Sequence, residues 1–125
     1  MIVTSDVLYS ARPEAFVNLG MCQRKLDDLE NAEKSFKKAL LMDPDNVLAL
    51  VELGHLAYDQ GKVIEARRYF EALRNSEVLQ SPRALWLGVI IARKQGDLDL
   101  EASMSLKLKS LYPDSSEYQR DRYDQ

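Results

Sequence analysis

Few residues in this sequence have the chemistry that builds disulfides, metal centres or membrane spans. The chain contains one cysteine and one histidine, Cys22 and His55. A single cysteine excludes an intrachain disulfide, and a lone histidine leaves a histidine-based metal site without a second imidazole. No apolar run approaches the ~18 residues that a membrane-spanning helix needs. We therefore expect no cofactor, no metal and no direct insertion into a membrane.

An excess of charge of one sign is also lacking. The 17 basic and 20 acidic residues give a formal net charge of −3, and like charges form no long block. This balance does not favour nucleic acid as a partner. The N-terminal segment lacks the basic start and long apolar centre of a signal peptide. If the chain is a whole gene product, we expect it to be soluble and cytoplasmic.

What the sequence does contain is an internal repeat. Glycines recur with a spacing of 34 residues, each preceded by leucine, and an alanine and a phenylalanine further along the unit recur with the same spacing. The matched residues are Leu19-Gly20, Leu53-Gly54 and Leu87-Gly88, then Ala32 with Ala66 and Phe36 with Phe70. Glycine inside a helix costs about 1 kcal/mol relative to alanine, so glycines in register indicate close packing between helices.

The period predicts an all-α fold. Two antiparallel helices of about 12–14 residues with two short turns occupy about 34 residues, and large apolar residues recur at helical spacing between the small ones. We predict one domain, an α-solenoid of three antiparallel helix-turn-helix units forming a right-handed superhelix. The units cover about 13–46, 47–80 and 81–115, with 1–12 as the end of a preceding helix and 116–125 as a polar helical tail.

The repeat resembles the tetratricopeptide repeat. The residues that carry the resemblance are Leu19-Gly20, Ala32, Phe36, Ala39 and the helix-closing Pro44. It covers about residues 13–115, and the third unit departs most from the pattern, as terminal repeats do. The resemblance implies a module that binds other proteins.

A second resemblance is to the C-terminal half of the type IV pilus biogenesis lipoproteins of the PilF/PilW family. It rests on Tyr69-Phe70, Leu87-Gly88, Gly96-Asp97 and Tyr112-Pro113 followed by Ser115. It implies a role in assembling the pilus secretin at the outer membrane. Family members have about six repeats and a lipidated N-terminal cysteine, whereas this chain has three repeats and Cys22 within a helix. Two alternatives stay open: a fragment of such a periplasmic, outer-membrane-associated lipoprotein, or a different repeat protein.

Residues able to carry out chemistry have simpler structural explanations. His55 has no second histidine or cysteine nearby, and Cys22 on an apolar helix is expected to be a small buried hydrophobe. The carboxylates at Asp27-Asp28 and Asp43/Asp45 lie in turns, where aspartate caps the next helix. No phosphate-binding or dinucleotide-binding glycine motif is present. We therefore predict a chain that is not an enzyme.

The first helices of stacked units line a concave face, which is where repeat proteins bind partners. The expected lining positions are Asn18, Met21, Gln23–Lys25, Val51, Glu52, His55, Tyr58, Asp59, Leu85, Trp86, Val89 and Arg93. We predict that a groove for an amphipathic helix or extended peptide is formed by Asn18, Met21, Lys25, Val51, His55, Tyr58, Trp86, Val89 and Arg93. Trp86 and Tyr58 would be its aromatic anchors. Alternatively, Trp86 belongs to the core.

A clamp for the C-terminal carboxylate of a partner is disfavoured. Asn18 fits one clamp position, but the equivalent positions in the next two units hold Glu52 and Trp86, and Glu52 would repel a carboxylate. The expected partner is a protein or peptide, and the second resemblance implies a role in type IV pilus assembly. The alternatives are a self-associating homodimer or an enzyme with an unrecognised site.

Overall fold

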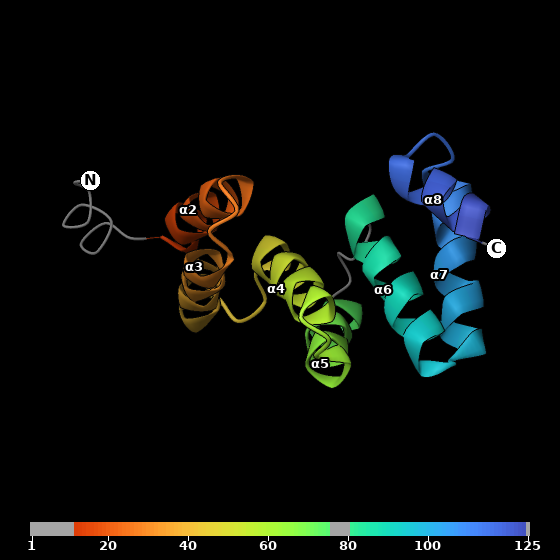
Figure 1. The fold of residues 1–125 in the computed structure, drawn as a ribbon, viewed down its shortest axis with the longest axis horizontal. Helices are drawn as coiled ribbons and strands as arrows, with labels where there is room; N and C mark the ends of the chain where they lie inside the picture. The colour runs from red at the N-terminus through yellow and green to blue at the C-terminus, as the bar shows by residue number, and fades with distance from the viewer. Residues whose placement is uncertain (1–11, 76–80, 125) are drawn as a thin grey trace.

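The computed structural model describes residues 12–75 and 81–124, and every element in these ranges is a helix. The predicted end of a preceding helix at residues 1–12 falls almost wholly outside them. With the labels of Figure 1, the helices are α2 (Pro13–Lys25), α3 (Leu29–Met42), α4 (Val47–Asp59), α5 (Val63–Arg74), α6 (Pro82–Gln95), α7 (Leu98–Leu111) and α8 (Ser116–Asp124).

The helices pair into three hairpins that follow one another along the long axis of the molecule (Figure 1). α2 packs on α3, α4 on α5 and α6 on α7, and successive hairpins contact each other through α3 with α4, α5 with α6 and α4 with α6. This arrangement confirms the predicted all-α solenoid.

Side-chain caps begin most of these helices. Asn46 accepts a hydrogen bond from the Ala49 N–H at 3.0 Å, and Ser81 accepts one from the Ala84 N–H at 3.1 Å. Asp28 caps α3 and Asp97 caps α7. These bonds satisfy donors that the first turn of a helix leaves unpaired. Of the predicted aspartate caps, Asp28 is confirmed, whereas the cap of α4 is Asn46 and not Asp45.

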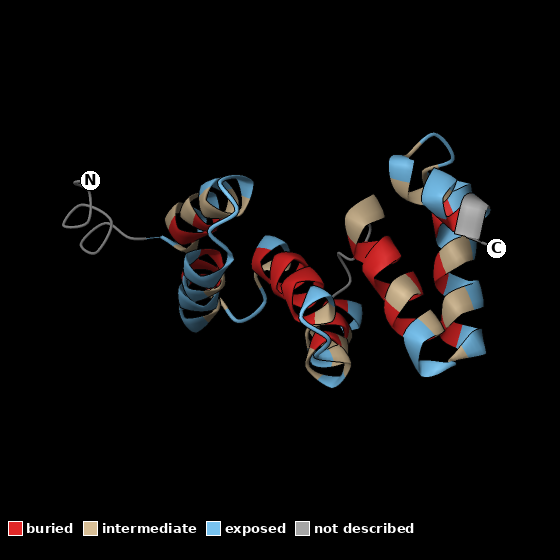
Figure 2. Ribbon diagram, in the orientation of Figure 1, coloured by how far each residue is buried: buried red, intermediate tan, exposed pale blue. Residues whose placement is uncertain are grey.

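The core consists of two apolar clusters that meet at α4. One cluster joins α2 and α3 to one side of α4, and the other joins the opposite side of α4 to α5, α6 and α7. As a result, every residue from 49 to 57 is buried. Figure 2 shows α4 and α6 as the helices with the most extensive buried surface. α4 is therefore the central helix of the stack.

The repeated glycines lie where a first helix meets a large side chain. A Cβ atom added to Gly88 would lie 2.6 Å from Cζ of Phe70 and 2.8 Å from Cγ of Met104, and one added to Gly20 would lie 2.7 Å from Cε1 of Phe36. Phe36 and Phe70 are completely buried. The predicted packing reason for the glycines is confirmed, because these distances leave no room for a methyl group.

The last helix, α8, folds against α6 and α7. The Ser115 hydroxyl accepts a hydrogen bond from the Tyr118 N–H at 3.0 Å. Asp121 is only 1% exposed, and it accepts a hydrogen bond from Nη2 of Arg93, whose Nε donates to Glu101 at 2.6 Å. The expected polar tail is thus helical, and one of its carboxylates is buried against the third hairpin.

We predict that Gly88→Ala destabilises the protein. Overpacking a filled core typically costs about 1–3 kcal/mol, which exceeds the ~1 kcal/mol that alanine contributes through helix propensity. Urea denaturation should therefore give a lower free energy of unfolding. Ser110→Ala, at an exposed position of α7, is the control and should leave it nearly unchanged. An unchanged or higher value for Gly88→Ala would show that Met104 and Phe70 repack freely.

Candidate partner-binding site

A small polar cleft crosses the three first helices α2, α4 and α6. Its volume is about 240 Å³. It is lined by Arg24 of α2, by Glu52, His55, Leu56 and Asp59 of α4, by Arg83 of α6, and by Asp27 and Leu29 at the turn between α2 and α3. Side chains from all three hairpins thus converge on one place.

A buried carboxylate organises the cleft. The Glu52 side chain is 3% exposed and lies between two arginines. Arg83 donates from Nε to Oε2 at 2.8 Å and from Nη2 to Oε1 at 3.0 Å, a bidentate pair. Arg24 approaches from the other side, with Nε 3.2 Å from Oε1. Glu52, the residue expected from sequence to repel a ligand carboxylate, is therefore itself paired with two guanidinium groups.

His55 joins α4 to α6. Its Nε2 donates a hydrogen bond to the carbonyl oxygen of Arg83 at 3.0 Å, and the residue is 7% exposed. Burial lowers the pKa of His55 below its ordinary value of 6.5, and the nearby Arg83 guanidinium lowers it further. A neutral imidazole at this position therefore helps to hold the two helices together.

Asp27 adopts a conformation that is unusual for its residue type. Its φ is +62°, in the left-handed region, and the corresponding turns of the next two hairpins carry glycines with φ of +80° at Gly61 and +71° at Gly96. Aspartate enters this region more readily than most residues, yet glycine does so at lower cost. The Asp27 carboxylate, which lines the cleft, therefore occupies a turn position at which the next two hairpins have glycine and so no side chain.

The nine residues predicted to form the groove divide into three groups. Asn18 and Lys25 are exposed, and Met21 and Tyr58 are partly exposed. Val51, His55, Trp86 and Val89 are buried, and Trp86 at 7% exposure belongs to the core cluster. Arg93 is partly exposed and bonded to Glu101 and Asp121, with its guanidinium 5.7 Å from the centre of the Trp86 ring.

The exposure that the groove prediction assumed for four residues is therefore wrong. Val51, His55, Trp86 and Val89 are inaccessible because α4 has neighbours on both sides and α8 folds against α6. The predicted burial of Cys22 is also wrong, since this residue is exposed. Sequence reasoning missed Arg83 and Asp27 as cleft residues. The signal that could have found Asp27 is an aspartate at a turn where the next two units have glycine, whereas no local pattern marks Arg83.

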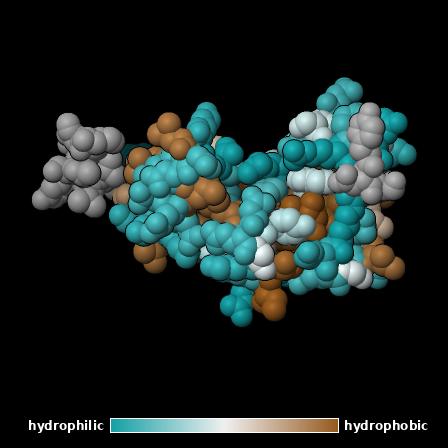
Figure 3. Space-filling view, in the orientation of Figure 1, coloured by the Kyte–Doolittle hydropathy of each residue, from teal (hydrophilic) through white to brown (hydrophobic). Residues whose placement is uncertain are grey.

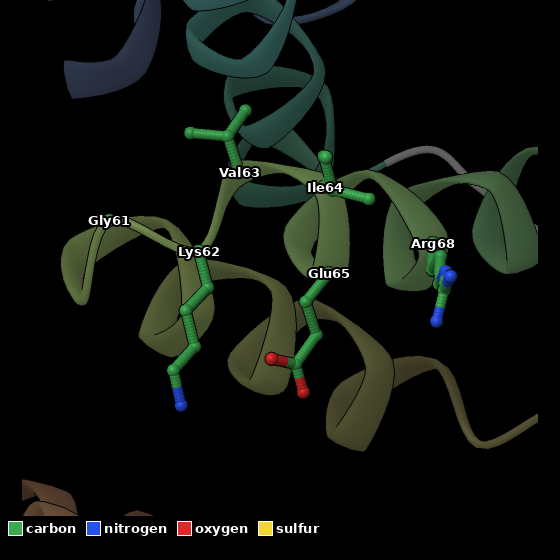
Figure 4. A pocket seen from close by; sticks show the side chains of 6 residues that line it. All are labelled: Gly61, Lys62, Val63, Ile64, Glu65 and Arg68. Carbon is green, nitrogen blue, oxygen red and sulfur yellow. The ribbon is translucent and has the colours of Figure 1, made fainter.

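A larger hollow, about 540 Å³, lies elsewhere. It is lined by Gly61, Lys62, Val63, Ile64, Glu65 and Arg68, from the α4–α5 turn and the start of α5. Figure 4 shows Lys62 and Glu65 pointing to one side of this segment and Val63 to the other. Because one turn and one helix form it, we place the candidate site at the polar cleft.

The surface carries hydrophobic residues in separate patches. Figure 3 shows such patches within a largely hydrophilic face. Within residues 12–75 and 81–124, no helix is both long and apolar enough to cross a membrane. In the same part of the chain, no group of three or more histidine, cysteine, aspartate or glutamate residues is placed to hold a metal ion.

Comparison with known proteins gives matches over nearly the whole chain. Residues 13–46 and 51–116 match family models described as tetratricopeptide repeat. The type IV pilus assembly protein PilF of Pseudomonas aeruginosa is 33% identical over 116 residues, which are 93% of this chain and 46% of that protein. The chain therefore spans about half the length of this relative.

Two solved structures show the same arrangement. A structure of Pseudomonas aeruginosa pilF has a TM-score of 0.85 at 32% identity and covers 96% of this chain and 54% of its own. A structure of PilW, described as a widely conserved type IV pilus biogenesis factor, has a TM-score of 0.68 at 26% identity and covers 86% of this chain and 49% of its own. The resemblance to both proteins expected from sequence is confirmed.

Replacing Asp27 with glycine should stabilise the protein. Removing the Cβ from a left-handed position relieves strain, and we expect the free energy of unfolding in urea to rise by a few tenths to about 1 kcal/mol. The reverse change at the matched turn, Gly61→Asp, should lower it. If Asp27→Gly were destabilising, the Asp27 side chain would have to contribute more to folding than its conformation costs.

The buried His55 should make stability depend on pH. Because its folded pKa lies below 6.5, the unfolded chain binds a proton more readily, so stability is full above pH 6.5 and falls as the pH drops toward the folded pKa. One such group accounts for up to about 1.4 kcal/mol between pH 7.5 and 5.5.

The measurement is the free energy of unfolding of wild type and His55→Gln at pH 7.5 and 5.5. Glutamine keeps a side-chain donor but does not titrate, and His55 is the only histidine in the chain. The variant should lose less stability on acidification than wild type. If wild type and the variant lost equal stability on acidification, a group other than His55 would be responsible for the pH dependence.

Proposed function

Because the chain belongs to the tetratricopeptide repeat family, we propose that it is a non-catalytic scaffold that binds a segment of a partner protein along the face of α2, α4 and α6. The observation that carries the proposal is the cleft itself, where side chains from three consecutive first helices converge. A site of this kind depends on the stacking of the hairpins, and it is therefore suited to a ligand that extends across them.

We propose that the accessible members of the predicted groove contact this partner. These are Asn18, Met21, Lys25 and Tyr58, which belong to α2 and α4, two of the helices that supply side chains to the cleft. In this proposal the buried members, Val51, His55, Trp86 and Val89, act indirectly by fixing how α4 and α6 pack. Arg93 acts in the same way through α8, because its guanidinium is bonded to Asp121.

The partner that we propose is a component of type IV pilus assembly. The support is the similarity to PilF, a type IV pilus assembly protein, and to PilW, a type IV pilus biogenesis factor. Since the chain spans about half of each relative, the pilus role is proposed for this chain as a module.

Site-specific photocrosslinking in the source cells tests both parts of the proposal. A photoreactive amino acid placed at Asn18, Lys25 or Tyr58 should crosslink to one partner protein, identified by mass spectrometry as a pilus assembly component. The same amino acid at Arg68 of α5 or Lys109 of α7, both exposed and outside the cleft, should not. Tyr58→Ala should reduce the yield from Lys25.

Three other outcomes would contradict parts of the proposal. Equal crosslinking from Arg68 and Lys109 would show that the partner does not bind specifically along the face of α2, α4 and α6. Crosslinks from the cleft side to an unrelated protein would contradict the pilus role while leaving the binding face intact. Crosslinks only between copies of this chain would favour the self-associating scaffold.

A further inference from the structure

We propose that the chain pairs with a second copy of itself through the outer face of α7, as an antiparallel helix pair. This inference goes beyond the proposed function, because it concerns a second helix and not the face of α2, α4 and α6. Three observations carry it: an exposed apolar stripe on α7, charged residues at the matched positions of α3, and charges beside the stripe that are complementary to those of a reversed copy.

The apolar stripe of α7 consists of Leu98, Ala102 and Leu106. A spacing of four residues places them on one face of the helix. Leu98 is 75% exposed, Leu106 is 63% exposed, and Ala102 is exposed as well. The buried residues of α7 lie on the opposite face, two positions away from members of the stripe. α7 is therefore apolar on both faces, and the described residues cover only one of them.

The other second helices carry charge at the matched positions, which lie 34 and 68 residues earlier in the chain. In α3 all three positions are charged and exposed, namely Glu30, Lys34 and Lys38. Lys34 forms an ion pair with Glu30, with Nζ 3.6 Å from Oε1. In α5 the middle position is Arg68. A hairpin of this protein thus packs without an apolar stripe here, so packing within the third hairpin does not account for the stripe.

The stripe is complementary to itself in the antiparallel orientation. It has an alanine between two leucines and therefore reads the same in both directions. In a pair of α7 helices related by a two-fold axis near Ala102, Leu98 of each copy lies against Leu106 of the other. The small alanine at the centre allows the two helices to approach closely. A symmetric dimer requires a face that is complementary to itself, and the stripe meets this requirement.

The charges beside the stripe favour the same orientation. Asp99 and Lys107 are exposed, and each directly follows a leucine of the stripe, so both lie on the same side of it. Neither forms an ion pair within the part of the chain that the structure describes. The antiparallel pair brings Asp99 of one copy opposite Lys107 of the other, twice in each dimer. A parallel pair would instead place like charges opposite each other. The second copy is therefore the occupant that these residues fit.

Pairing through α7 leaves the polar cleft accessible. None of the residues that line the cleft belongs to α7. The dimer therefore presents two clefts, and a partner with two binding segments would be held more tightly than by one copy. A single pair of helices covers less surface than most stable dimer interfaces, so we expect reversible association with a dissociation constant on the order of 100 µM.

The test is sedimentation equilibrium at chain concentrations from about 10 µM to about 1 mM, where wild type should pass from monomer to dimer. A reducing agent excludes a disulfide through the exposed Cys22. Leu106→Lys introduces the residue type that α3 has at Lys38, and it should weaken dimerisation at least tenfold, or about 1.4 kcal/mol. Ile64→Glu is the matched control, because Ile64 is 70% exposed on α5 and Glu30 is its counterpart on α3. It should leave the dissociation constant unchanged.

Charge reversal tests the antiparallel orientation. Asp99→Lys and Lys107→Asp should each weaken dimerisation, because each variant places like charges opposite each other in its own dimer. An equimolar mixture of the two variants should dimerise about as strongly as wild type, since both facing pairs then have opposite charges. A loss of folding does not produce such a rescue, and circular dichroism should confirm that every variant is helical.

Three results would overturn the inference. The first is a wild-type chain that stays monomeric throughout the concentration range, even if the stripe then bound lipid vesicles or another protein. The second is equal weakening by Leu106→Lys and Ile64→Glu, and the third is a mixture that dimerises no better than either charge variant alone. The proposed function is tested separately, because crosslinks between copies from Lys109 of α7 agree with this dimer and only crosslinks to another protein report on the cleft.

Discussion

The stack depends on close contact between a glycine of each first helix and a large side chain. Gly20 meets Phe36 within its own hairpin, Gly88 meets Phe70 of the preceding hairpin, and Gly54 meets Leu87 of the following one. These contacts bring helices together within and between hairpins, so one residue type at one spacing determines both levels of packing. Because these contacts allow the helices to pack closely, they underlie both the dense core around α4 and the convergence of α2, α4 and α6.

The fold was predictable from sequence because the constraint that produces it is periodic. A glycine, an alanine and a phenylalanine recurring every 34 residues are visible without coordinates. The candidate cleft was predicted only in part. The face of the first helices, where the cleft lies, was chosen from sequence, but helical periodicity does not reveal that α4 has neighbours on both sides, which is why Val51 and His55 were expected to be accessible. Arg83 was missed because it contributes to the cleft only when α6 packs on α4, a contact between hairpins that no local pattern encodes.

Polar side chains, as well as apolar ones, link the hairpins of this protein. Besides Glu52 with its two arginines, Gln60 donates to Glu33 at 3.3 Å, and Arg67 donates to Gln95 at 2.9 Å and to Asp97 at 3.2 Å. Each bond joins one hairpin to the next. Because hydrogen bonds depend on direction, they restrict the angle between neighbouring hairpins more than apolar contact does. The shape of the face formed by α2, α4 and α6 is therefore set partly by these bonds.

The position of α4 between the two apolar clusters has a consequence for how the molecule opens. If the first hairpin separates from the stack, Ala49, Leu53 and Leu56 lose their cover, because these residues pack in the cluster with α2 and α3. The remaining hairpins keep their own cluster and need not unfold with it. Amide hydrogens of α2 and α3 would then exchange with solvent earlier than those of α6, and the N-terminal hairpin would behave as a separate cooperative unit.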